Sequence, residues 1–184
     1  MYSGHMFIAL TGTPGCGKTS ISGLLENEFG YRVVHLNELI KSENLFIEED
    51  EQRDCVVTDI DVVQKRLSAI EESEKPVIID SHMAHLIADV SIVLRTAPEE
   101  LKKRLGKRGY KPAKVDENIE AECLDVILVE SVENCEMVFE VDTTGRSMSE
   151  VAGDVREIID GISSGHPPLD KFKPGAFDWS GEIF

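Results

Sequence analysis

A glycine-rich run near the amino terminus has the residue types and spacing of a loop that binds phosphate. Residues 12–19 read GTPGCGKT and fit the pattern G-x-x-x-x-G-K-[ST] in full. Glycines let the backbone curl so that successive N–H groups face phosphate oxygens, and the start of a following helix adds partial positive charge. In this pattern the ammonium of Lys18 reaches the β- and γ-phosphates, and the hydroxyl of Thr19 binds Mg²⁺. We call the run the phosphate loop.

The phosphate loop therefore predicts a site for Mg–ATP, and a glycine-rich turn without a ligand is the alternative. Within the loop, Cys16 lies beside the expected helix start and Lys18. Both neighbours favour a thiolate, which gives the hypothesis that Cys16 is sensitive to oxidation. The alternative is a small residue that merely fits the loop. The expected ATP-binding residues here are Gly12, Gly15, Cys16, Gly17, Lys18, Thr19 and Ser20.

A carboxylate and a histidine follow another apolar run. Val77-Ile78-Ile79 predicts a buried strand that ends at Asp80, and proteins with a phosphate loop place a second carboxylate near Mg²⁺. We expect Asp80 to hold Mg²⁺, partly through water. His82 is a candidate to orient water or a phosphate. A strand-end cap and an ordinary surface histidine are the alternatives for these two residues.

Seven of the 19 Lys and Arg residues gather within residues 102–114 of a chain whose formal net charge is -16. Positive charge that closes over phosphates stabilises the charge that builds up in phosphoryl transfer. Arg104 and Arg108 share one helix face at i, i+4 spacing. We expect both to bind ATP and Arg108 to act in catalysis together with Lys18, Asp80 and His82. A solvated helix face is the alternative.

The elements that must position these residues alternate between strand and helix. This order predicts an α/β protein with the P-loop NTPase three-layer fold, in which a five-stranded parallel sheet is flanked by helices. A short helix and turn is expected over residues 39–47. The expected strands are at 7–11, 31–36, 77–80, 90–94 and 137–141. The expected helices are at 18–29, 58–70, 98–109, 116–132 and 147–161.

Composition excludes several classes of protein. The chain has 184 residues, of which 41% are apolar, so one folded domain is expected. No apolar run approaches the ~20 residues that span a bilayer, and the start does not resemble a secretory signal. We expect a cytoplasmic monomer that binds no membrane. A net charge of -16 argues against direct binding of nucleic acid and is compatible with a basic protein partner. The four cysteines form no C-x-x-C pair, so neither zinc nor a disulfide framework is expected.

The two ends differ from the rest of the chain. Residues 1–5 are either a remnant of cloning before Met6 or a native extension. From residue 163 to 184, proline and glycine predict an extended tail. Because this tail also carries large apolar side chains, we expect it to pack on this domain or on a partner. These side chains are Phe172, Phe177, Trp179, Ile183 and Phe184.

Together, four segments resemble the atypical adenylate kinase family, the archaeal and eukaryotic type that is also linked to maturation of the small ribosomal subunit. The resemblance covers about residues 6–162. It implies transfer of the ATP γ-phosphoryl group to AMP or another nucleoside monophosphate (NMP), with Mg²⁺ as cofactor and possible hydrolysis of ATP. The four segments are the phosphate loop, Asp80-Ser81-His82, Val93-Leu94-Arg95-Thr96 and Arg104-x-x-x-Arg108-Gly109-Tyr110.

The resemblance implies a layout in three parts. A P-loop kinase domain over residues 6–162 contains an NMP-binding segment near 37–58 and a lid near 107–117. Lys41 stands where relatives carry an arginine that contacts the acceptor phosphate, and it lacks the bidentate fork of arginine. Residues 116–132 contain no arginine, although typical adenylate kinases carry arginines after the lid. This departure leaves an ATPase role open.

Two functions therefore compete. The first is an NMP kinase that acts on AMP. The second is an assembly factor with little kinase activity, whose ATP state switches its grip on a basic small-subunit ribosomal protein of the eleven type. The resemblance implies both. Acidic residues such as Glu48 to Glu51 are candidates to hold the basic partner.

Overall fold

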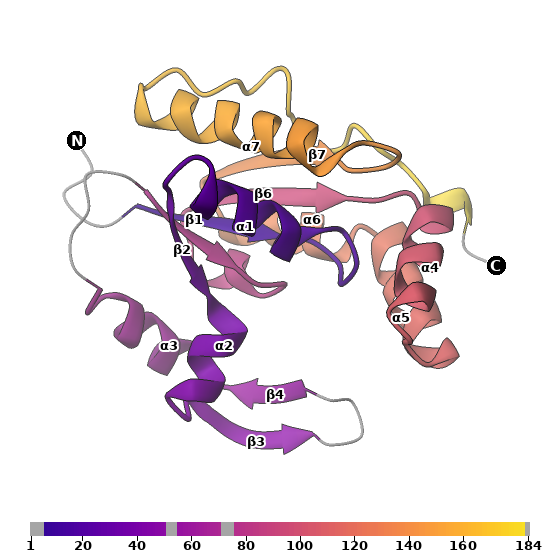
Figure 1. Cartoon of the computed structure of the whole chain (residues 1–184), viewed down its shortest axis with the longest axis horizontal. Helices are drawn as coiled ribbons and strands as arrows, with labels where there is room; N and C mark the ends of the chain where they lie inside the picture. Colours follow the sequence, from indigo (N-terminus) through magenta and orange to yellow (C-terminus); the bar gives the residue numbers. More distant parts are fainter. Residues whose placement is uncertain (1–5, 51–54, 71–75, 183–184) are drawn as a thin grey trace.

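The central sheet has five parallel strands in the order β2-β5-β1-β6-β7 (Figure 1). The structure is a computed structural model that describes residues 6–50, 55–70 and 76–182. Short apolar runs form these strands because both faces of the sheet are covered. The predicted fold class is confirmed. The strands are β1 (Phe7–Thr11), β2 (Arg32–His35), β5 (Val77–Asp80), β6 (Val90–Arg95) and β7 (Met137–Asp142).

Successive side chains of a strand point to opposite faces of the sheet, so an apolar layer forms on each face. On one face, Ile8 and Leu10 of β1 pack with α1 (Lys18–Asn27) and α7 (Met148–Ser163). On the other face, the intervening Ala9 packs with helices α2 and α3, and α6 packs against β6 and β7. The further helices are α2 (Leu36–Ser42), α3 (Ile60–Leu67), α4 (Pro98–Lys107), α5 (Pro112–Cys123), α6 (Val126–Asn134) and the 3₁₀ turns η1 (Ala84–Leu86) and η2 (Ser180–Glu182).

The strand register brings the predicted site residues to one edge. Asp80, the last residue of β5, pairs with Leu10 of β1 on one side and His35 of β2 on the other. The phosphate loop starts directly after β1. Because the carboxyl ends of parallel strands meet at one edge of the sheet, this edge is where ligands bind in open α/β folds.

The short helix and turn expected over residues 39–47 are confirmed only up to Asn44, because an antiparallel hairpin begins at Phe46. Helix α2 ends at Ser42, and Asn44 adopts a left-handed conformation with a φ of 55°. The chain then forms β3 (Phe46–Asp50) and β4 (Cys55–Thr58). Residues 45–47 are three consecutive apolar residues, which is not the spacing of an amphipathic helix. After the turn at Asn44 they lead into strand β3. Most of the acidic run Glu48 to Glu51 lies outside the side chains that the structure describes, as do residues 1–5.

The single helix expected over residues 116–132 is also wrong. The chain breaks between α5 and α6, where Asp125 has a φ of 54°. The guanidinium of Arg95 donates to the backbone oxygen of Glu122 at 3.1 Å and to the carboxylate of Asp125. Because Glu122 and Asp125 both bind the buried guanidinium of Arg95, they stabilise the turn between α5 and α6. Helix propensity alone does not predict this turn.

The described part of the aromatic tail packs on the protein's own domain, and Ile183 and Phe184 lie outside the described residues. Phe172 is buried, and its carbonyl accepts from the N–H of Glu140 at 2.9 Å. The ring of Trp179 stacks on Phe177 with centroids 5.9 Å apart, and the Arg95 guanidinium lies 4.8 Å from its centroid. In Figure 1 the tail runs along α7 and ends beside α4 and α5. Within the described ranges, no helix has the length and apolar character needed to cross a membrane.

Trp179→Ala is expected to lower the free energy of unfolding by about 2 kcal/mol, since it removes a cation–π contact and a stacked ring. Urea denaturation followed by circular dichroism measures the change. Leu169→Ala is the control, because Leu169 is an apolar tail residue with half its surface exposed. Equal unfolding midpoints for the two variants would show that the tail does not stabilise the domain.

Candidate active site

The phosphate loop has a shape that two of its glycines make possible. Gly12 has a φ of 134°, and a Cβ there would lie 2.4 Å from the backbone oxygen of Leu94 in β6. Gly15 has a φ of 100°, and a Cβ there would lie 2.7 Å from the side chain of Leu101 in α4. Any side chain at either position would push the loop off the sheet or off α4.

Lys18 folds back over this loop. Its Nζ donates to the backbone oxygens of Gly12 at 2.5 Å and Thr13 at 3.2 Å. Burial lowers the pKa of Lys18, while the negative charges of Asp80 and Glu122 act in the opposite direction. The ammonium is thus held at the mouth of the loop, where a phosphate oxygen can replace the carbonyl acceptors.

Asp80 is anchored beside the first turn of α1. Its Oδ2 accepts from the hydroxyl of Ser22 at 2.7 Å and lies 3.1 Å from Nδ1 of His35. Among the residues that the structure describes, no group donates to Oδ1. The side chain of Thr19, one turn before Ser22, is exposed. One open carboxylate oxygen and one hydroxyl suit Mg²⁺, which keeps several waters and takes few protein ligands.

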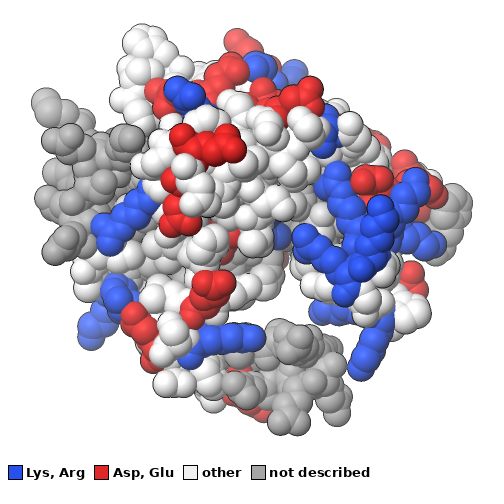
Figure 2. Space-filling model, viewed as in Figure 1, with Lys and Arg blue, Asp and Glu red and all other residues white. Residues whose placement is uncertain are grey.

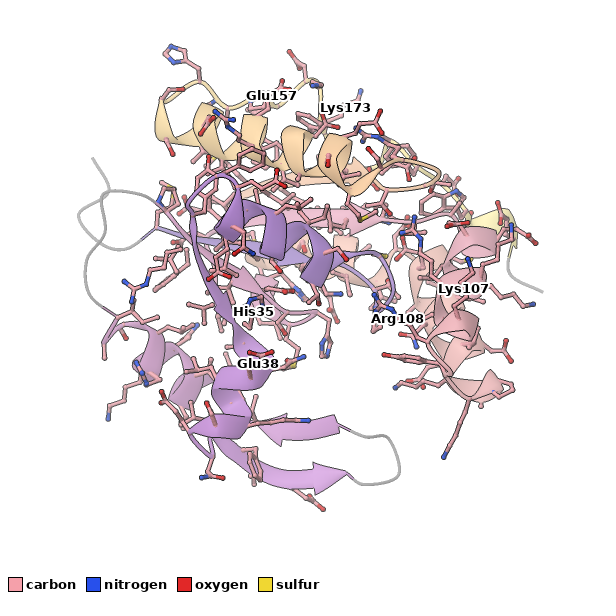
Figure 3. The ribbon with its side chains drawn as sticks, viewed as in Figure 1. His35, Glu38, Lys107, Arg108, Glu157 and Lys173 are labelled. Atoms are coloured by element: carbon pink, nitrogen blue, oxygen red, sulfur yellow. The ribbon has the colours of Figure 1, made fainter. Side chains whose placement is uncertain are left out.

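Sequence reasoning missed Ser22 and His35. His35 ends β2 just as Asp80 ends β5, so the shared strand-end position was an available signal. Figure 3 shows His35 at the end of β2 and, across the phosphate loop, Arg108. In the described part of the chain, no cluster of three or more His, Cys, Asp or Glu residues could hold a metal ion by itself.

His82 lies on the same edge with its ring exposed to solvent. Its backbone oxygen accepts from the hydroxyl of Thr11 at 3.2 Å. Partial desolvation, and then the positive charges of Lys18 and His85, lower the pKa of His82 to about 4. A neutral imidazole at pH 7 can accept a hydrogen bond from water.

Basic side chains gather over α4 and α5, and the surface is hollowed between them and the β3–β4 hairpin (Figure 2). Arg108 closes the last turn of α4, and Gly109 follows with a φ of 75°. Arg108 makes no ion pair within the described ranges, and its charge helps to lower the pKa of Lys18. An unpaired guanidinium beside an open space suits an anion.

The two other predicted cations lie elsewhere. Arg104 donates to the side-chain and backbone oxygens of Thr143, at 3.0 and 2.9 Å, and to Glu100 at 3.1 Å. These bonds hold it against the loop between β7 and α7. Lys41 is exposed on the last turn of α2, with no ion pair to another described residue. The binding of phosphate by Arg104 and of NMP by Lys41 stays a prediction.

The thiolate expected at Cys16, on which the hypothesis of oxidation sensitivity depends, is contradicted by the direction of its pKa shift. The Cys16 side chain is fully buried. Burial, and then the charge of Glu122, raise the pKa of its thiol to about 12 and outweigh the lowering effect of Lys18. A buried thiol above its ordinary pKa is inert.

We therefore expect Cys16 to resist alkylation and peroxide in the folded protein at pH 8. Mass spectrometry after iodoacetamide treatment measures this, and the same treatment in urea is the control. Equal labelling of Cys16 in the folded and unfolded chain would contradict the burial of this thiol.

The sequence is similar to a known family and to several curated proteins. A family model described as an AAA domain matches residues 8–125. The "Putative adenylate kinase" of Methanosarcina acetivorans is 53% identical over 181 residues, covering 95% of this chain and 97% of the relative. The protein of the same name from Methanocaldococcus jannaschii is 45% identical over 180 residues, covering 97% and 96%.

Solved structures show the fold. Shikimate kinase from Acinetobacter baumannii in complex with shikimate is similar with a TM-score of 0.60 and 16% identity, covering 86% of this chain and 94% of that one. Deoxyadenosine kinase from M. mycoides with products dCMP and dCDP bound has a TM-score of 0.54 and 16% identity, covering 85% and 100%.

Proposed function

The chain belongs to the archaeal adenylate kinase-like family of P-loop proteins, and on that premise we propose that it transfers the γ-phosphoryl group of Mg–ATP to AMP. One observation carries the proposal. The phosphate loop with Lys18, the open oxygen of Asp80 and the unpaired Arg108 converge at the carboxyl edge of the sheet. The relatives that cover 95% and 97% of this chain carry the name "Putative adenylate kinase".

In the proposed reaction, an oxygen of the AMP phosphate attacks the γ-phosphorus of ATP. The bond between this phosphorus and the β–γ bridging oxygen breaks, and two ADP molecules result. The attacking oxygen already lacks a proton at pH 7, so no strong base is needed. Positioning and charge stabilisation therefore carry the rate.

Each residue has a role in this proposal. Lys18 and Arg108 stabilise negative charge on the transferring group. Thr19 and Asp80 hold Mg²⁺, Asp80 partly through water, and the bound ion neutralises charge on the β- and γ-phosphates. His82, neutral at pH 7, orients a water or an acceptor oxygen. Desolvation of Lys18 strengthens its attraction for phosphate.

The acceptor is proposed to enter between the hairpin and α5. The hollow in Figure 2 opens there. Lys41 on α2 is the proposed contact for the acceptor phosphate. As a point charge it would hold the phosphate less rigidly than an arginine does.

Hydrolysis of ATP is the second candidate activity. Residues 116–132 carry no arginine that could help to hold an acceptor, and an exposed neutral His82 beside Lys18 could orient a water molecule instead. The proposed partner of this activity is a basic small-subunit ribosomal protein. A net charge of -16 supports such a partner through long-range attraction.

Steady-state turnover with Mg–ATP tests the proposal. AMP, GMP, CMP, UMP and water are compared as acceptors at equal concentration. Formation of ADP that depends on AMP supports the kinase. A rate that is the same with every acceptor and with water would instead support the ATPase.

A further inference from the structure

A buried carboxylate lies directly beneath the phosphate loop. It belongs to Glu122, at the C-terminal end of α5, and only 3% of this residue is exposed. We propose that Glu122 is a positioning residue that fixes the phosphate loop to α5 and so sets the affinity for the nucleotide. The proposal rests on the proposed function only in requiring that the phosphate loop binds ATP.

The two oxygens of Glu122 are divided between two tasks. Oε2 accepts from the hydroxyl of Thr13 and lies 3.9 Å from the sulfur of Cys16, so it holds the phosphate loop. Oε1 accepts from Nε of Arg95 at 2.9 Å and from the N–H of Thr96 at 3.0 Å, so it is fixed to the end of β6. The carboxylate thus joins the loop to the sheet.

Glu122 contacts Thr13 and Cys16, which lie in the part of the phosphate loop that must face a bound phosphate. Cys16 N–H donates to the Thr13 oxygen at 3.1 Å, which closes the turn between the two residues that Glu122 contacts. Lys18 also donates to the Thr13 oxygen. A change at Thr13 would therefore shift both the backbone N–H groups and the ammonium that face phosphate.

Burial makes this contact specific. Thr13 is 2% exposed and Arg95 is 1% exposed. Buried charges and hydroxyls require partners, and removing one leaves the other without compensation. Burial by itself lowers the pKa of Arg95, but the charges of Glu122 and Asp125 more than offset it, so the pKa is raised and the cation persists.

The position of Glu122 also connects the loop to the basic turn at residues 108–111. Helix α5 starts at Pro112, directly after that turn, and Glu122 lies near its other end. Helix α5 therefore joins that turn to the phosphate loop.

A second carboxylate provides a matched control. Glu140 is also 3% exposed, and its Oε1 accepts from Nη1 of the same Arg95 at 2.6 Å. Its Oε2 accepts from the N–H of Ala176 in the tail at 2.8 Å. In the described part of the chain, Glu140 makes no hydrogen bond or ion pair with the phosphate loop. A substitution there disturbs the same cation without disturbing the loop.

The experiment compares Glu122→Gln with Glu140→Gln. The dissociation constant for a non-hydrolysable Mg–ATP analogue is measured by calorimetry, and the urea midpoint is measured in parallel. We expect both variants to lose stability, and Glu122→Gln alone to bind the analogue about tenfold more weakly or worse, the loss typical of a hydrogen bond to a charged group. Equal affinities for the two variants would overturn the proposal.

Variants of Thr13 keep the test decisive if Glu122→Gln does not fold. Thr13→Val removes the hydroxyl with little change of shape and is expected to weaken binding about as much as Glu122→Gln. Thr13→Ser keeps the hydroxyl and should bind like the unchanged protein. If both variants fold, combining Thr13→Val with Glu122→Gln should add little further loss. Unchanged affinity in Thr13→Val would contradict the proposal.

The proposed transfer to AMP can fail without this inference failing. Normal binding of the ATP analogue with no phosphorylation of AMP would refute the kinase activity and leave the role of Glu122 to be decided by the variants. Strong AMP phosphorylation with equal analogue binding in all variants would support the kinase activity and refute the role of Glu122.

Discussion

Lys18→Ala should reduce phosphoryl transfer by about 10³-fold, because it removes the cation that faces the transferring group in a partly desolvated site. In the structure its ammonium already lies over the loop, held by the oxygens of Gly12 and Thr13. The side chain makes no contact on which the core depends, so the variant should fold. Initial rates at saturating Mg–ATP and AMP measure the effect.

Lys173→Ala is the control for lost charge. Lys173 is exposed in the tail, and Figure 3 shows it over α7, away from the phosphate loop. Its replacement should leave the rate unchanged. Turnover within a few fold of normal in a folded Lys18→Ala variant would show that the phosphate loop is not where the reaction occurs.

Asp80→Asn should lower turnover by about 10²-fold and raise the Mg²⁺ concentration needed for half-maximal rate, because a neutral amide holds the ion poorly. The amide can still accept from Ser22, so the anchoring of this side chain at the end of β5 persists. A titration of Mg²⁺ at fixed ATP separates the loss of metal binding from the loss of rate.

Asp89→Asn provides the comparison for Asp80. Asp89 is exposed just before β6 begins, at the opposite edge of the sheet. Its replacement should change neither turnover nor the Mg²⁺ concentration needed for half-maximal rate. An unaltered Mg²⁺ requirement in Asp80→Asn would mean that the residue is only a strand-end cap.

The sequence predicted those parts of the site that local patterns encode. The phosphate loop has a strict spacing, and the apolar run before Asp80 places this carboxylate at a strand end. Parallel pairing of β5 with β1 then brings both to one edge. These features depend on short stretches of chain, so the residues alone are enough to find them.

The parts that sequence reasoning missed depend on contacts between distant residues. The turn before α6 is bonded to Arg95 of β6, and the hairpin after Asn44 depends on the pairing of β3 with β4. The raised pKa of the Cys16 thiol comes from burial and from the charge of Glu122, not from its neighbours in sequence. In the sequence, nothing distinguishes Glu122 from the other acidic residues of its helix. Its contact with Thr13 forms only in the folded protein.

The fate of the γ-phosphate tests the central claim most directly. ATP carrying radioactive phosphorus at the γ position is mixed with Mg²⁺ and the protein, with and without AMP, and the products are separated. The account predicts that AMP diverts the label into newly formed ADP, and that Lys18→Ala abolishes this. Release of the label as inorganic phosphate at the same rate with and without AMP would contradict it.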